Sequence, residues 1–144
     1  MYELRPVTED DREWLYQLNR SSMRDHVIQT WGSWDEASQR EYFDGRFVPE
    51  RRQIIRTDGA DVGALIVERD PSRLRIGDIA LLPAVQSRGI GTEVIRDLLD
   101  EAASLEIPVE LQVLKVNPAR RLYERLGFAA FDETETHILM RASQ

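Results

Sequence analysis

Residues 77–100 (GDIALLPAVQSRGIGTEVIRDLLD) constrain the fold more than any other stretch, because they indicate a strand, a turn and a helix in direct succession. The run from Ile79 to Leu82 is apolar without a helical period, and Pro83, which lacks the N–H that a sheet needs, ends it. After two glycines, apolar residues recur at helical spacing: Val94, Ile95, Leu98, Leu99 and Ala102. The pattern predicts a buried strand that leads through a tight turn into a helix N-terminus.

The turn from Gln86 to Gly91 is suited to binding a phosphate. Backbone N–H groups at a helix N-terminus have no intrahelical partner and carry the positive end of the helix dipole. Glycine allows an anion to approach these amides closely, and Arg88 adds a full positive charge. The turn lacks the lysine of a Walker loop and the third glycine of the Rossmann fingerprint, so neither of these phosphate sites is present.

A second motif occupies residues 117–128 (NPARRLYERLGF), directly after an alternating stretch that predicts a strand over 108–114. Asn117 is a favoured N-cap and Pro118 is favoured in the first helical turn. Gly127 suits the left-handed position that ends a helix, with Phe128 packing back against it. These residues predict a short, well-delimited helix.

Both motifs resemble signatures of the GNAT N-acetyltransferases. Gln86 to Gly91 is similar to Q/R-x-x-G-x-G/A, and residues 117–128 resemble N-x-x-A-x-x-L-Y-x-x-x-G-F with one residue fewer between Asn117 and Tyr123. The resemblance implies a single α/β domain over residues 1–144, with a mixed, mostly antiparallel sheet of about seven strands, helices on both faces and a splay at the central strand. It implies acetyl transfer from acetyl-CoA to a primary amine of a small molecule or peptide. The alternative is a non-catalytic acyl-CoA-binding module with a sensory or regulatory role.

The same resemblance implies where acetyl-CoA would bind. The turn would hold the pyrophosphate with Gln86 bracing it, the strand edge would hold the pantetheine arm, and Asn117 would bond the pantetheine. The implied contacts are Ile79, Ala80, Leu81, Gln86, Ser87, Arg88, Gly89, Ile90, Gly91, Thr92 and Asn117.

Catalytic roles follow from the chemistry that thioester aminolysis requires. Tyr123 occupies the family position of the general acid that protonates the departing thiolate, and a backbone N–H at Leu81 or its neighbour would stabilise the oxyanion. The general base stays open between Asp78, Glu110, His137 and a water relay. Glu110 is expected to be a solvated strand residue.

Residues 21–34 show poor periodicity, and we expect a short helix followed by a loop. Trp31 and Trp34 flank Gly-Ser in this segment. In the family that the chain resembles, this region forms a wall of the acceptor site, and aromatic rings can hold a cation. We therefore predict that Trp31 and Trp34 bind the acceptor, with packing onto the core as the alternative.

The amino-acid composition limits the classes of binding partner that we expect. A formal net charge of −7 argues against a nucleic-acid footprint and suits a cationic amine. The chain has no cysteine, and its two histidines lie far apart, so we expect neither disulfides nor a metal site. No long apolar run is present, which predicts a cytoplasmic protein without a membrane span. Assembly into a homodimer is left open.

Overall fold

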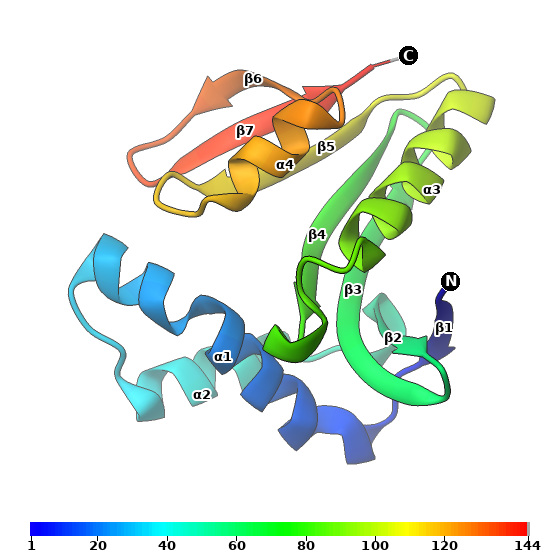
Figure 1. Cartoon of the computed structure of the whole chain (residues 1–144). Coiled ribbons are helices and arrows are strands. Elements are labelled where there is room, and N and C mark those ends of the chain that lie inside the picture. The colour runs from blue at the N-terminus through cyan, green and yellow to red at the C-terminus, as the bar shows by residue number, and fades with distance from the viewer. Residues whose placement is uncertain (144) are drawn as a thin grey trace.

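The structure, a computed structural model, describes residues 1–143 and contains one seven-stranded sheet with helices on both faces (Figure 1). The strands lie in the order β1-β2-β3-β4-β5-β7-β6. Their bounds are β1 Glu3–Pro6, β2 Arg52–Thr57, β3 Ala60–Asp70, β4 Arg73–Leu81, β5 Val109–Leu114, β6 Ala129–Glu133 and β7 His137–Ala142. The helices are α1 Arg12–Trp31, α2 Glu36–Arg46, α3 Ile90–Ser104 and α4 Ala119–Arg125. This architecture confirms the predicted fold class.

The sheet divides where its two central strands diverge. All neighbouring strands are antiparallel except β4 and β5, which pair in parallel only between Leu74–Ile76 and Val109–Leu111. Strand β4 continues to Leu81, so beyond Ile76 its β5-facing edge has no strand partner. This gap, which we call the splay, was predicted at the central strand.

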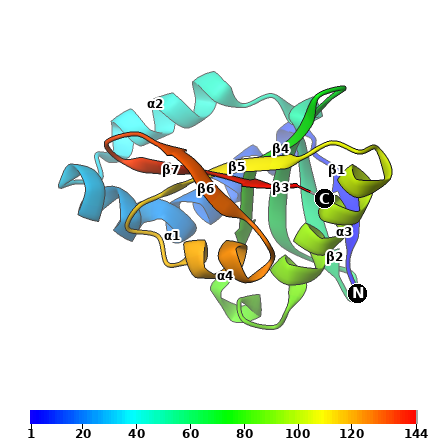
Figure 2. The same ribbon diagram turned by 90° about the horizontal axis from the view of Figure 1, so that it is seen from above.

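The helices lie on opposite faces of the sheet (Figure 2), and two apolar clusters hold them there. Helix α3 contributes Val94, Ile95, Leu98 and Ala102 to the larger cluster, which also contains inward side chains of β3, β4, β5 and β7. The smaller cluster joins Leu15 and Leu18 of α1 and Phe43 of α2 to Ile54, Ala64 and Ala80 of the sheet. On their side of the sheet, helices α1 and α2 therefore cover only the half formed by β2, β3 and β4.

A bulge in β4 reverses which side chains point to which face. Val67 pairs with Ile76 and Ile66 pairs with Asp78, so Gly77 is the extra residue. Before the bulge, Leu74 and Ile76 belong to the larger cluster, and after it Ala80 belongs to the smaller one. Because side chains alternate along a strand, Asp78 shares the α1 and α2 face with Ala80.

Helix α1 corrects the prediction for residues 21–34. Instead of a short helix and a loop, one continuous helix runs from Arg12 to Trp31. It ends at Gly32, whose φ of 94° is the left-handed conformation of a helix stop. The periodicity is weak because the second half of α1 contributes only Val27 to the buried residues. Within residues 1–143, no helix has both the length and the apolar character needed to cross a bilayer.

Candidate active site

The turn before α3 has the geometry of an anion-binding helix N-terminus. Gly89 is the N-cap with φ 86°, Ser87 is also left-handed at φ 66°, and helix α3 begins at Ile90. Nothing lies within 4 Å of the position that a Cβ on Gly89 would take. Gln86 donates from Nε2 to the carbonyl of Leu81 at 3.1 Å, so it braces the turn as predicted. The turn can therefore present the first amides of α3 to a phosphate group.

The edge of β4 in the splay offers further backbone groups. The N–H of Leu82 donates to the Val62 carbonyl at 2.8 Å, which sets the alternation of hydrogen bonds between β3 and β4. By that alternation Ile79 and Leu81 direct their backbone groups into the splay, whereas those of Ala80 point to β3. Ile79 and Leu81 can thus bond an extended ligand arm, and Ala80 contributes no backbone bond there.

Helix α4 places Tyr123 on the opposite side of the splay. Asn117 accepts a hydrogen bond at Oδ1 from the Ala119 N–H at 2.9 Å, and Gly127 ends the helix with φ 101°, as predicted. The Tyr123 ring packs edge-on against Phe128, with centroids 5.9 Å apart. Burial, and to a smaller extent the negative charge of Asp78, raises the pKa of Tyr123 to about 12. The phenol therefore keeps its proton at neutral pH.

Asp78 is the carboxyl group at the splay. It is half-buried, and burial raises its pKa, while the charge of Arg52 and the N–H of Ile79 act in the opposite direction. Because Asp78 acts electrostatically on Tyr123, the two side chains lie near each other although they come from β4 and α4. A carboxyl with a raised pKa beside a protonated phenol provides one base and one acid at the same place.

The two predicted acceptor tryptophans differ in their surroundings. Trp31, at the end of α1, is 57% exposed, and its ring centroid lies 6.4 Å from that of His137 at the start of β7. Trp34 is half-buried and packs against the smaller apolar cluster. The structure therefore favours the packing alternative for Trp34 and leaves Trp31 accessible to a ligand.

Glu110 differs from its predicted environment. It is only 9% exposed and lies between Arg73 and Arg141, whose guanidinium groups are 2.6 Å and 2.8 Å from its carboxylate. Burial by itself would raise the pKa of Glu110, but hydrogen bonds from Arg73 and Arg141 outweigh burial and lower it. An ion-paired carboxylate with a lowered pKa is a poor proton acceptor, so the structure argues against Glu110 as the base.

His137 is a weaker candidate base than Asp78. Its Nδ1 is 2.8 Å from the Thr136 hydroxyl, and burial lowers its pKa. Its ring lies beside that of Trp31. Sequence reasoning also missed Arg52 altogether, because no motif singles out the first residue of β2.

Residues 12–128, which include the whole site, match the Acetyltransferase (GNAT) family. No curated protein matches the sequence. Among solved structures, PaiA N-acetyltransferase from Thermoplasma acidophilum in complex with coenzyme A superposes with a TM-score of 0.78 at 16% identity, covering 100% of this chain and 99% of that one.

Two further solved structures are similar over nearly their full length. The ribosomal-protein-S18-alanine N-acetyltransferase of Escherichia coli has a TM-score of 0.69 at 20% identity, covering 99% of this chain and 94% of its own. Arabidopsis thaliana Naa50 in complex with the bisubstrate analogue CoA-Ac-MVNAL has a TM-score of 0.66 at 16% identity, covering 99% of each chain.

Proposed function

The chain belongs to the acetyltransferase (GNAT) family, so its reaction is transfer of an acetyl group from acetyl-CoA to an amine, and we propose that Asp78 and Tyr123 are its base and acid. The observation that carries this proposal is the placement of a desolvated carboxyl and a desolvated phenol on the two sides of the splay. The proposed binding residues for acetyl-CoA are the turn from Gln86 to Thr92, the β4 edge and Asn117.

In the proposed reaction, the acceptor amine approaches from the α1 and α2 face, where Asp78 points. Asp78 takes a proton from the ammonium, and the neutral amine attacks the thioester carbon. The Leu81 N–H, directed into the splay, stabilises the oxyanion that forms. The tetrahedral intermediate collapses, the C–S bond breaks, and Tyr123 gives its proton to the thiolate. The nitrogen loses its second proton, which restores the phenol, and the proton held by Asp78 leaves to solvent.

The acceptor is proposed to be a primary amine of a small molecule or a peptide; the peptide is supported by the ribosomal-protein acetyltransferase and by Naa50 with its bisubstrate analogue, which share this fold. Trp31 is its proposed wall residue, while Trp34 supports the wall from the core side. A cytoplasmic location, the lack of a nucleic-acid partner and a homodimer stay predictions from the sequence.

Release of free thiol from acetyl-CoA, measured across a panel of amines and peptides, tests the function. We expect acceptor-dependent thiol release and an acetylated amine in equal amounts. Tight binding of acetyl-CoA with no turnover on any acceptor would instead favour the acyl-CoA-binding module.

A further inference from the structure

Arg52 is a cation beside the acceptor site that has no anionic partner of its own. It is half-buried at the start of β2, and its guanidinium lies 5.1 Å from the Phe43 ring centroid and 5.6 Å from that of Phe47. No hydrogen bond contributes to its pKa, which burial lowers and the more distant charge of Asp78 raises. Over residues 1–143, no carboxylate lies within ion-pair distance of Arg52.

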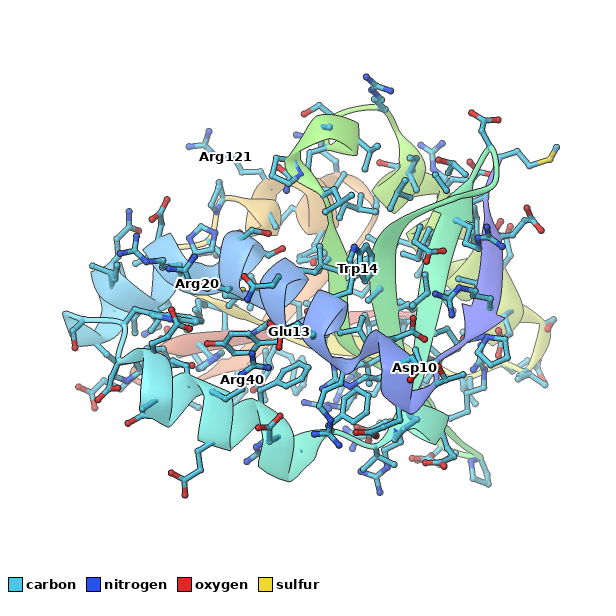
Figure 3. All side chains as sticks on the ribbon, turned by 90° about the horizontal axis from the view of Figure 1, so that it is seen from below. Asp10, Glu13, Trp14, Arg20, Arg40 and Arg121 are labelled. Carbon is cyan, nitrogen blue, oxygen red and sulfur yellow. The ribbon has the colours of Figure 1, made fainter. Side chains whose placement is uncertain are left out.

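Three arginines of α1 and α2 are paired with carboxylates. Arg12 bonds Glu9 and Asp44, Arg20 bonds Glu36 at 2.7 Å, and Arg40 bonds Glu13 at 2.5 Å. Figure 3 shows Glu13, Arg20 and Arg40 gathered around α1 and α2. Arg52 differs from these in being desolvated by two aromatic rings while its charge is left uncompensated at short range.

The register of the sheet fixes where Arg52 lies relative to Asp78. Arg52 pairs with Ile66, and Ile66 pairs with Asp78, so the three side chains stand in one row across β2, β3 and β4. Directly opposite residues share a face, and the adjacent row, Ile54-Ala64-Ala80, packs under α1 and α2. Arg52 and Asp78 therefore face the acceptor side together, with backbones two strand spacings, or about 10 Å, apart.

The two charges are near enough to act on one ligand but do not pair with each other. A guanidinium held against aromatic rings keeps its in-plane N–H groups available, and these match the two oxygens of a carboxylate. Asp78 in turn suits an ammonium group. The row thus presents a negative and a positive site in line with the reacting centre.

We propose that the acceptor carries a carboxylate as well as the primary amine, with Arg52 binding the carboxylate while Asp78 receives the amine. This inference rests on the proposed function and specifies its substrate class. The same chemistry occurs on a free amino acid and on a polypeptide whose first residue is acidic.

A series of matched acceptors tests this proposal. Straight-chain ω-amino acids with one to six methylene groups are compared with n-alkylamines and ω-amino amides of equal length, using thiol release to obtain kcat/KM. We expect the acid to be preferred by about 10- to 100-fold at one or two chain lengths, the loss typical of one charged hydrogen-bonded contact. The tripeptides Glu-Ala-Ala and Gln-Ala-Ala, compared in the same way, distinguish a polypeptide acceptor from a free amino acid.

Arg52 variants assign the preference to this side chain. Arg52→Gln should remove the preference for the acid over the alkylamine of equal length, because any change in rate that passes through Asp78 is shared by both acceptors, whereas Arg52→Lys should retain part of the preference. Arg46→Gln is the matched control, because Arg46 lies over the Tyr42 ring at 4.4 Å but is exposed on α2. Unchanged calorimetric binding of acetyl-CoA confirms that each variant is folded.

The outcomes separate the two proposals. Turnover of alkylamines and amino acids at equal rates, or a preference for the acid that persists in Arg52→Gln, overturns the carboxylate site and leaves the transferase function standing. Failure to acetylate any member of the series or either peptide counts against both.

Discussion

Asp78 of β4 and Tyr123 of α4 lie near enough for the charge of the carboxyl to raise the pKa of the phenol, although 45 residues of sequence separate them. Each strand-to-helix unit alone would supply only one of these groups. The bulge at Gly77 turns Asp78 away from the larger core at the point where β4 leaves β5, so its carboxyl is free of that core at the splay. The divergence proposed to admit acetyl-CoA between the strands is therefore also where the proposed acid and base lie.

Replacement of Tyr123 by Phe should slow acetyl transfer while leaving the fold intact. The ring and its edge-on contact with Phe128 stay, and only the proton is lost. A positioned general acid contributes about 10²- to 10⁴-fold, and the lower end is expected because a CoA thiolate is a moderately good leaving group. Single-turnover transfer at saturating acetyl-CoA measures the effect. An unchanged rate would assign Tyr123 to packing.

Asp78→Asn should change the pH dependence of kcat/KM as well as its size. In the parent protein Asp78 takes its proton from the ammonium form of the acceptor, so only Asp78 must be ionised beforehand, and the logarithm of kcat/KM should rise with a slope of one below the pKa of Asp78 and level off above it, whereas the variant depends on the small fraction of amine that is already neutral. The variant should show a slope of one throughout and a rate lower by about 10²- to 10³-fold. A variant profile that still levels off as the parent's does would place the base elsewhere.

Gly89→Val should weaken acetyl-CoA binding by several kcal/mol, because a β-branched side chain at this position would keep the pyrophosphate away from the amides of the turn. The left-handed φ of 86° adds backbone strain of about 1 to 3 kcal/mol. Gly59→Val is the control, because Gly59 has a φ of 79° in the turn between β2 and β3, far along the chain from α3. Calorimetry should show weaker binding only for Gly89→Val, and an equal decrease in affinity in the two variants would contradict the prediction.

The geometry of the turn before α3, the proposed acetyl-CoA site, could be predicted from sequence because each feature that forms it is local. A proline ends the strand, a left-handed glycine starts the helix, and Gln86 reaches back only five residues. Asn117 and Gly127 delimit α4 in the same way.

The acceptor side depends on relations that are not local. Simple alternation from Leu74 and Ile76 would place Asp78 in the larger core, and only the bulge at Gly77 reverses this. Arg52 becomes visible only through its register with Ile66 and Asp78 across three strands. The full length of α1 was not predicted for a related reason: the helix continues through a second half in which only Val27 is buried.

Trp31→Ala and Trp34→Ala should separate acceptor binding from packing. Trp31 is exposed, so its removal should raise the acceptor KM with little change in the melting temperature. Trp34 packs on the smaller cluster, so its removal should cost about 2 to 3 kcal/mol of stability. Thermal melts run beside kinetics decide this, and a stable Trp34→Ala protein with a raised KM would restore Trp34 to the acceptor site.

Glu110→Gln should destabilise the protein without changing the chemistry. The substitution leaves Arg73 and Arg141 without their buried carboxylate, at a cost of about 1 to 3 kcal/mol because both arginines are partly exposed. Since the pKa of Glu110 is lowered in the folded state, its stabilisation is present above the unfolded carboxyl pKa and is lost as pH falls through the folded value. The difference in unfolding free energy between parent and variant should therefore shrink in acid.

Asp78→Asn should have the opposite effect on the free energy of unfolding in the same denaturation experiment. Burial raises the pKa of Asp78, so the ionised carboxyl opposes folding once pH exceeds the unfolded value, and the Asn variant should match or exceed the parent in stability at neutral pH. That advantage should vanish below the usual carboxyl range, where both side chains are neutral. Chemical denaturation at pH 3 and pH 7 distinguishes the two sites. We expect Glu110 to contribute to stability and Asp78 to contribute to the chemistry. A loss of activity in Glu110→Gln as large as in Asp78→Asn would overturn this division of roles.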